Sequence, residues 1–124
     1  TPKSFVEQEL AEGRSVILEI DVQGAMRVKA AYPDAVLIFI APPSMSELKS
    51  RLIHRGTESS EAIDRRFETA YQEMKYIDRY DYVVVNDILD LAIARTEDII
   101  VAERCRVSRN SELIEKLQGG RNAL

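Results

Sequence analysis

Three short apolar runs alternate with helical segments along this chain, and this alternation limits the folds that it can adopt. The runs lie near residues 15–21, 35–40 and 82–86, and each holds consecutive aliphatic residues over a length typical of buried strands. Strands that alternate with helices form βαβ units, and these units build a parallel sheet with right-handed crossovers. We therefore predict an α/β fold with three parallel strands and with helices that cover both faces of the sheet.

Helix signals fill the stretches between the apolar runs. Ser4 with Glu7 and Ser44 with Glu47 have the spacing of capping boxes, and Asp87 can cap a later helix. One segment has apolar residues that recur at helical spacing over its whole length, which is the clearest periodic signal in the chain. The expected helices cover residues 4–12, 23–31, 44–55, 59–77 (the periodic segment), 87–106 and 111–118.

The composition excludes several classes of protein. A net charge of −4 gives no broad attraction to nucleic acid or to an anionic membrane, so a bound anion would need locally arranged arginines. The single cysteine, Cys105, cannot form an internal disulfide and is typical of a reducing compartment, which predicts a cytoplasmic protein. His54 is the only histidine, and without a Cys/His cluster we expect no structural zinc.

Two acidic residues, Glu19 and Asp21, end the first apolar run. They are two positions apart, so their side chains project to the same side of a strand. Neighbouring like charges need a cation or hydrogen-bond donors, unless the strand runs out into solvent. Open α/β sheets bind ligands beyond the carboxyl ends of their strands. The pair therefore fits either a metal and nucleotide site or a solvated strand end.

Three arginines flank the polar loop near residues 57–60. Arg51 and Arg55 are four positions apart on one predicted helix, and Arg66 lies at the edge of the apolar stripe of the next. An ion pair with Glu47 would account for Arg51, and packing of the aliphatic stem would account for Arg66. Arginines that face carboxylates across a sheet rim favour phosphoryl transfer, because they neutralise phosphate charge while a carboxylate helps to hold Mg²⁺ through water.

These residues stand in motifs that resemble those of guanylate kinase in order and spacing, from Thr1 to about Gly119. The resemblance implies a P-loop nucleoside monophosphate kinase fold and transfer of the γ-phosphate of ATP to GMP with Mg²⁺. A guanylate-kinase-like scaffold domain that binds phosphopeptides would share the fold, but the retained charged residues favour the enzyme. The motifs are LEIDVQG (18–24), IAPPS (40–44), LKSRLIHRGTES (48–59), the following Arg66, and YDYVVVND (80–87).

The resemblance also implies roles for individual residues. Arg51 and Arg66 would be catalytic, and Glu19 and Asp21 would hold Mg²⁺ through water. Glu19 stands where the family usually has aspartate. The residues that would bind ATP are Arg51, Arg55 and Asn86, and those that would bind GMP are Thr1, Glu19 and Asp21.

The resemblance further implies that this sequence is the C-terminal portion of such a kinase. Residues 1–14 would end the GMP-binding domain, 15–47 and 72–124 would form the core, and about 48–71 would form the lid region. The sequence has no GxxxxGK[ST] phosphate-binding loop, whose strand would separate 15–21 from 35–40. We expect a second copy or a swapped segment to fill this gap, or the strands to pair directly, and we expect the 124 residues alone to be inactive.

Overall fold

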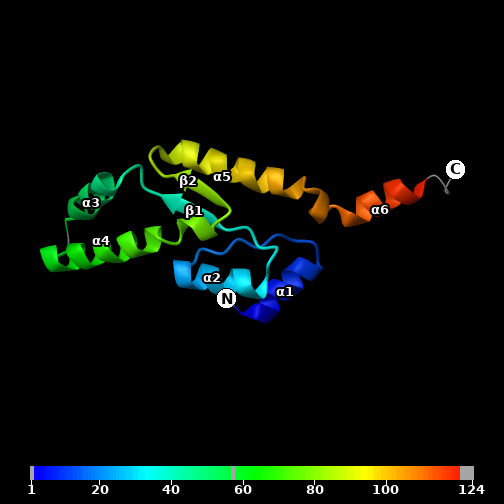
Figure 1. Cartoon of the computed structure of the whole chain (residues 1–124), viewed down its shortest axis with the longest axis horizontal. Coiled ribbons are helices and arrows are strands. Elements are labelled where there is room, and N and C mark those ends of the chain that lie inside the picture. Colours follow the sequence, from blue (N-terminus) through cyan, green and yellow to red (C-terminus); the bar gives the residue numbers. More distant parts are fainter. Residues whose placement is uncertain (1, 57, 121–124) are drawn as a thin grey trace. The chain divides into compact units, whose positions relative to one another are not determined.

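In the computed structural model the chain forms two units, Thr1–Ala35 and Val36–Leu124 (Figure 1). The structure describes residues 2–56 and 58–120. The first unit holds the helices α1 (Lys3–Ala11) and α2 (Val22–Ala31). The second unit holds both strands and the remaining helices.

Helix α1 starts one residue earlier than the sequence predicts. Pro2 is its N-cap residue, with φ −62° and ψ 135°, and among the described residues no side chain caps this helix. Ser4 therefore lies inside the first turn, so the predicted capping box of Ser4 with Glu7 is wrong. The helix ends as expected, because Gly13 follows it with a φ of +83° that other residues rarely adopt.

Residues 15–21 do not form the predicted strand. They lie in an extended stretch between α1 and α2, and the described residues provide them with no ladder partner. Ile17 is 79% exposed as a result. An apolar extended segment becomes a strand only when a neighbour accepts and donates its backbone hydrogen bonds. The direct pairing of this segment with the second run, one of the predicted alternatives, is absent from the described sheet.

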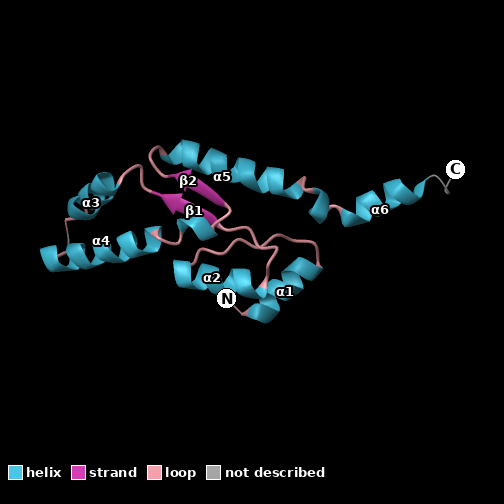
Figure 2. Ribbon diagram, viewed as in Figure 1, coloured by secondary structure: helices cyan, strands magenta, loops and turns pink. Residues whose placement is uncertain are grey.

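The second unit is built on two parallel strands, β1 (Ile38–Ala41) and β2 (Tyr82–Val85), which confirms the predicted α/β fold class (Figure 2). Their register pairs Ile38 with Tyr82 and Ala41 with Val85. Residues just before the ladder extend it, since the backbone N–H of Asp81 donates to the Leu37 carbonyl at 2.9 Å and the Leu37 N–H donates to Asp81 Oδ2 at 2.8 Å.

Helices make up the rest of this unit. Between β1 and β2 in sequence come α3 (Met45–His54), α4 (Ser60–Met74) and a 3₁₀ turn, η1 (Ile77–Arg79). After β2 come α5 (Leu89–Arg104), η2 (Val107–Arg109) and α6 (Ser111–Gly119). Ser44 caps α3 as predicted, and Ser59 caps α4, each through its Oγ atom. Asp87 does not cap α5, which was the prediction, because this helix begins two residues later with Ile88 as its N-cap residue.

On each face of the two-stranded sheet, only one of the two strands is buried, and the other is exposed. Paired residues of parallel strands project to the same face, so Ile40 shares a face with Val84, and Phe39 shares the other with Val83. Phe39 and Val84 are buried, whereas Ile40 is 52% and Val83 54% exposed. The predicted cover on both faces is therefore only partly present among the described residues, because each face leaves one strand exposed. Helix α5 packs on β2, while α3 and α4 pack mainly on one another.

The helices of the described part do not include a membrane span. The longest, α5, has 16 residues, and no helix in residues 2–56 and 58–120 combines the length and apolar character that crossing a bilayer requires.

Candidate functional site

Arg51 joins helix α3 to the loop that follows β2. Its Nε donates to Glu47 Oε1 at 3.2 Å, and its NH1 donates to the backbone carbonyl of Asn86 at 2.7 Å. Its NH2 lies 4.0 Å from Asp87 Oδ1. The structure thus brings Arg51 and Asn86, two of the predicted site residues, together at the carboxyl end of β2, which is where open α/β sheets bind ligands.

Local sequence explains why Arg51 reaches this position. The Oγ of Ser44 accepts the N–H of Glu47 at 3.0 Å, which starts α3 directly after β1. Arg51 lies about two turns further along, on the same side as Glu47, because positions four apart share a helix face. The surface ion pair with Glu47 that the sequence suggested is present, but the bond to Asn86 shows that Arg51 also contacts the sheet rim.

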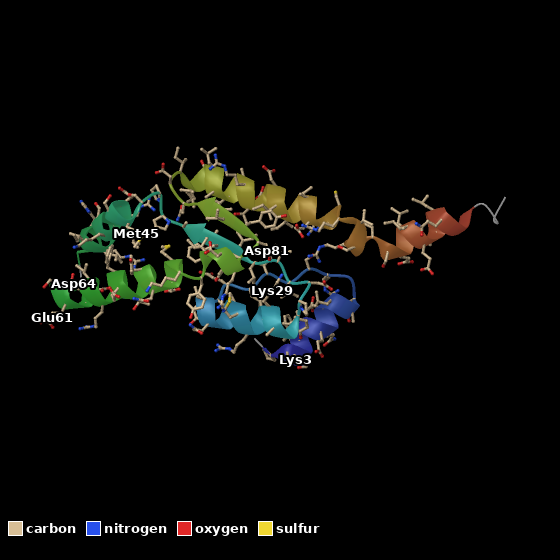
Figure 3. The ribbon with its side chains drawn as sticks, viewed as in Figure 1. Lys3, Lys29, Met45, Glu61, Asp64 and Asp81 are labelled. Atoms are coloured by element: carbon tan, nitrogen blue, oxygen red, sulfur yellow. The ribbon has the colours of Figure 1, made fainter. Side chains whose placement is uncertain are left out.

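The other two arginines make different contacts. Arg55 is the C-cap residue of α3, is exposed, and has no ion-pair partner within the described residues. Arg66 on α4 pairs with Glu58, with NH2 and Oε1 2.8 Å apart, and half of its side chain is exposed. Figure 3 shows Glu61 and Asp64 at the end of α4 that lies away from the strands, whereas Met45 lies nearer to the strands. Glu58 precedes the first residue of α4 by two positions, at this distant end of the helix.

The acidic pair belongs to the first unit, where Asp21 has a structural task that the sequence analysis missed. Asp21 is the N-cap residue of α2, and its Oδ1 accepts the N–H of Gly24 at 2.7 Å. The signal was present, since aspartate directly before a helical run is a favoured N-cap. Glu19 and Asp21 are both exposed. Thr1, the third predicted GMP contact, lies outside the described residues.

Gly24 fits closely against this cap. A Cβ atom at position 24 would lie 3.1 Å from Asp21 Oδ1 and 3.3 Å from the Cβ of Ile20. A side chain here would therefore press on the capping carboxylate. Gly24 therefore permits a close approach inside the first turn of α2.

A buried glutamate, Glu103, forms a network that sequence reasoning did not find. Its carboxylate accepts hydrogen bonds from the hydroxyl of Tyr82, from Arg106 Nε at 2.9 Å and from Arg109 NH2 at 3.4 Å. Glu103 is only 8% exposed. The hydrogen bond from Tyr82, followed by that from Arg106, lowers the pKa of Glu103 to about 2. The same bond raises the pKa of Tyr82. This network ties the end of α5 to β2.

Sequence comparison relates the chain to proteins of known activity. The family model described as guanylate kinase matches residues 1–103. The guanylate kinase of Caldanaerobacter subterraneus subsp. tengcongensis is 52% identical over 118 residues, which cover 95% of this chain and 57% of that protein. That of Clostridium perfringens (strain 13 / Type A) is 54% identical over 112 residues, which cover 90% of this chain and 52% of that protein.

Structure comparison gives the same result. The crystal structure of guanylate kinase from Anaplasma phagocytophilum superposes with a TM-score of 0.78 at 31% sequence identity. The match covers 99% of this chain and 58% of that one. The chain thus spans little more than half the length of the relatives that it matches.

Proposed function

Because the chain belongs to the guanylate kinase family, we propose that the full-length protein that carries it phosphorylates GMP with ATP and releases GDP and ADP. The observation that carries this proposal is the family match over residues 1–103, which includes every residue that the sequence motifs single out. The geometry of Arg51 supports it, since an arginine fixed at the carboxyl end of a parallel strand is well placed to meet phosphate.

The proposed roles follow the charges of the side chains. Arg51 and Arg66 would neutralise the transferring phosphoryl group and Arg55 the ATP phosphates, because phosphoryl transfer depends on positioning and charge stabilisation. Arg66 would exchange its carboxylate partner, Glu58, for phosphate oxygens. Asn86 would lie against ATP, and its carbonyl would hold Arg51.

Glu19 and Asp21, with Thr1, would bind GMP in the same proposal. Guanine carries N–H donors that carboxylates accept, and both carboxylates are exposed. Asp21 caps α2 with one oxygen only, Oδ1, and its Oδ2 makes no hydrogen bond within the described residues. It can therefore cap the helix and accept a further donor at once.

The same carboxylates suit a magnesium ion that is held through water. Residues 2–56 and 58–120 hold no group of three or more His, Cys, Asp or Glu side chains that could cage a metal. Kinases need no such cage, because Mg²⁺ keeps several waters and takes one or two carboxylates together with substrate phosphates. When bound with ATP, the ion supplies neutralisation of phosphate charge. Glu19 and Asp21 would hold its water ligands.

The division of the chain into parts is also proposed. Residues 1–14 would complete the GMP-binding domain, 15–47 and 72–124 the core, and 48–71 the lid region. The extended, unpaired stretch at 15–21 supports the need for a further strand beside it, from the rest of the protein or from a second copy. We place the protein in the cytoplasm, where its nucleotides occur and where the single Cys105 would stay reduced.

A coupled assay of ADP release tests this function. The full-length protein should turn over ATP only when GMP is present, and the isolated 124-residue chain should show no turnover. A full-length protein that binds phosphorylated peptides and fails to phosphorylate GMP would instead be the scaffold-type alternative.

A further inference from the structure

The start of helix α3 contains an incomplete capping box. Ser44 Oγ accepts the N–H of Glu47 at 3.0 Å, which is the first half of that motif. In the complete motif the glutamate side chain turns back to the backbone N–H of the serine. The carboxylate of Glu47 instead accepts Nε of Arg51 at 3.2 Å. The helix start fixes the backbone of Glu47, and its charge is directed to Arg51.

A second anchor holds the same guanidinium from another element. NH1 of Arg51 donates to the Asn86 carbonyl at 2.7 Å, across 35 positions of sequence. A guanidinium has five N–H donors in one plane. Two are used here, one on Nε and one on NH1. NH2 lies 4.0 Å from Asp87 Oδ1, which is beyond hydrogen-bond distance, so three donors remain for an anion. Contacts at both ends of the group fix the plane in which these three donors lie.

We propose that Glu47 is a positioning residue for the phosphoryl-transfer site, and that it acts by orienting the guanidinium of Arg51. This role rests on the proposed kinase activity. Arg55 lies one turn beyond Arg51 and has no ion pair within the described residues, so of the two arginines on α3 only Arg51 is oriented before the nucleotide arrives. A donor set that is fixed in advance loses less conformational entropy when it binds.

The chain offers a matched control for this proposal. Glu112 and Lys116 form an i, i+4 ion pair on α6, 3.7 Å apart, and both side chains are largely exposed. Such pairs add a little helix stability. If Glu47 only stabilised its helix, its loss would act like the loss of Glu112.

The test compares four variants of the full-length protein by steady-state kinetics and thermal unfolding: Glu47→Ala, Glu112→Ala, Arg51→Ala, and Glu47→Ala with Arg51→Ala. Glu47→Ala should lower kcat/KM for ATP by about tenfold or more, because small misplacements of a catalytic group can cost up to about a hundredfold. Glu112→Ala should leave kinetics unchanged, with a similar small shift in unfolding temperature. In the Arg51→Ala background, loss of Glu47 should have no further effect, because the two residues act as one unit.

Each result has a separate meaning. Equal kinetics in Glu47→Ala and Glu112→Ala would overturn the role of Glu47 and leave the kinase function standing. Losses that multiply in the double variant would overturn it too, since Glu47 would then act without Arg51. A wild-type protein that does not phosphorylate GMP would overturn the proposed function itself.

Discussion

The hydroxyl of Tyr82 on β2 donates a hydrogen bond to the carboxylate of Glu103 near the end of α5. Arg106 and Arg109 also donate to this carboxylate, so the buried charge is paired from both sides. A buried carboxylate without such donors would be strongly destabilising. The helix after β2 is therefore fastened to the sheet at its far end by a charged network as well as by apolar packing.

This network predicts a specific loss of stability in acid. The pKa of Glu103 is lowered to about 2 from the ordinary value of 4.5, so its contribution is complete above pH 4.5 and is lost as pH falls toward 2. Tyr82→Phe removes the largest cause of the shift. Its unfolding temperature should be lower than that of the wild type at pH 7, and the difference should shrink as the pH falls from 4.5 to 2.5. Thermal unfolding of the full-length protein across this range measures it.

Tyr71→Phe is the control for this prediction, because the Tyr71 ring is about half exposed. Its effect should be small and independent of pH. A Tyr82→Phe deficit that stays constant down to pH 2.5 would contradict the assignment of the shift to the Tyr82 hydroxyl.

Arg66 should be essential for turnover. Arg66→Ala should lower kcat by about 10³-fold or more, by analogy with arginine fingers that stabilise the transferring phosphoryl group. Arg65→Ala, the exposed neighbour on α4, is the control and should keep near wild-type kinetics. A loss of less than tenfold would leave Arg66 with a structural role, as the partner of Glu58 or as a packed stem.

Two substitutions at Asp21 separate its cap from its proposed role in binding. Asparagine caps helices about as well as aspartate, whereas alanine costs about 1 kcal/mol. Asp21→Asn should therefore keep the unfolding free energy, and Asp21→Ala should lower it. Both should raise KM for GMP, because both remove the charge. Denaturant unfolding and GMP titrations measure the two effects, and an unchanged KM in both variants would remove Asp21 from the binding site.

The isolated 124-residue chain should not behave as a stable monomer. Ile17, Ile40 and Val83 are each about half exposed or more, and the backbone of residues 15–21 has no ladder partner in the described part of the chain. Exposed apolar edges of this kind favour association. Sedimentation velocity should show oligomers or aggregates. A single monomeric species with cooperative unfolding would show that the chain needs no further strand.

Local signals predicted the local structure well. Ser44 was recognised as a cap, and the cores of β1 and β2 were found from their aliphatic runs. The prediction of a strand at 15–21 was wrong. The segment has the apolar pattern of a strand, but a strand also requires a partner for its backbone hydrogen bonds. Ser4 and Asp87 failed as capping residues for a simpler reason: the helices began one or two residues away from the expected position.

The candidate site was predictable only in part. Motifs identified Arg51 and Asn86, but nothing local indicates that the side chain of one bonds the backbone of the other. The network around Glu103 could not be predicted for the same reason, since its main partner, Tyr82, is 21 positions away in sequence. The roles of Asp21, Arg51 and Arg66 toward nucleotides stay predictions, which the kinetic experiments test.

The hydrogen bonds between Leu37 and Asp81 have a consequence for how the second unit assembles. They close a loop of 44 positions, whereas Tyr82 and Glu103 close one of 21. Loop closure costs entropy that rises slowly with length, so the shorter closure comes at a slightly smaller loss. We expect the packing of α5 against β2 to form first, and the pairing of β1 with β2 to complete the folding transition. φ-values should then be high at Val84 and low at Phe39, and the reverse order would show that the sheet nucleates folding.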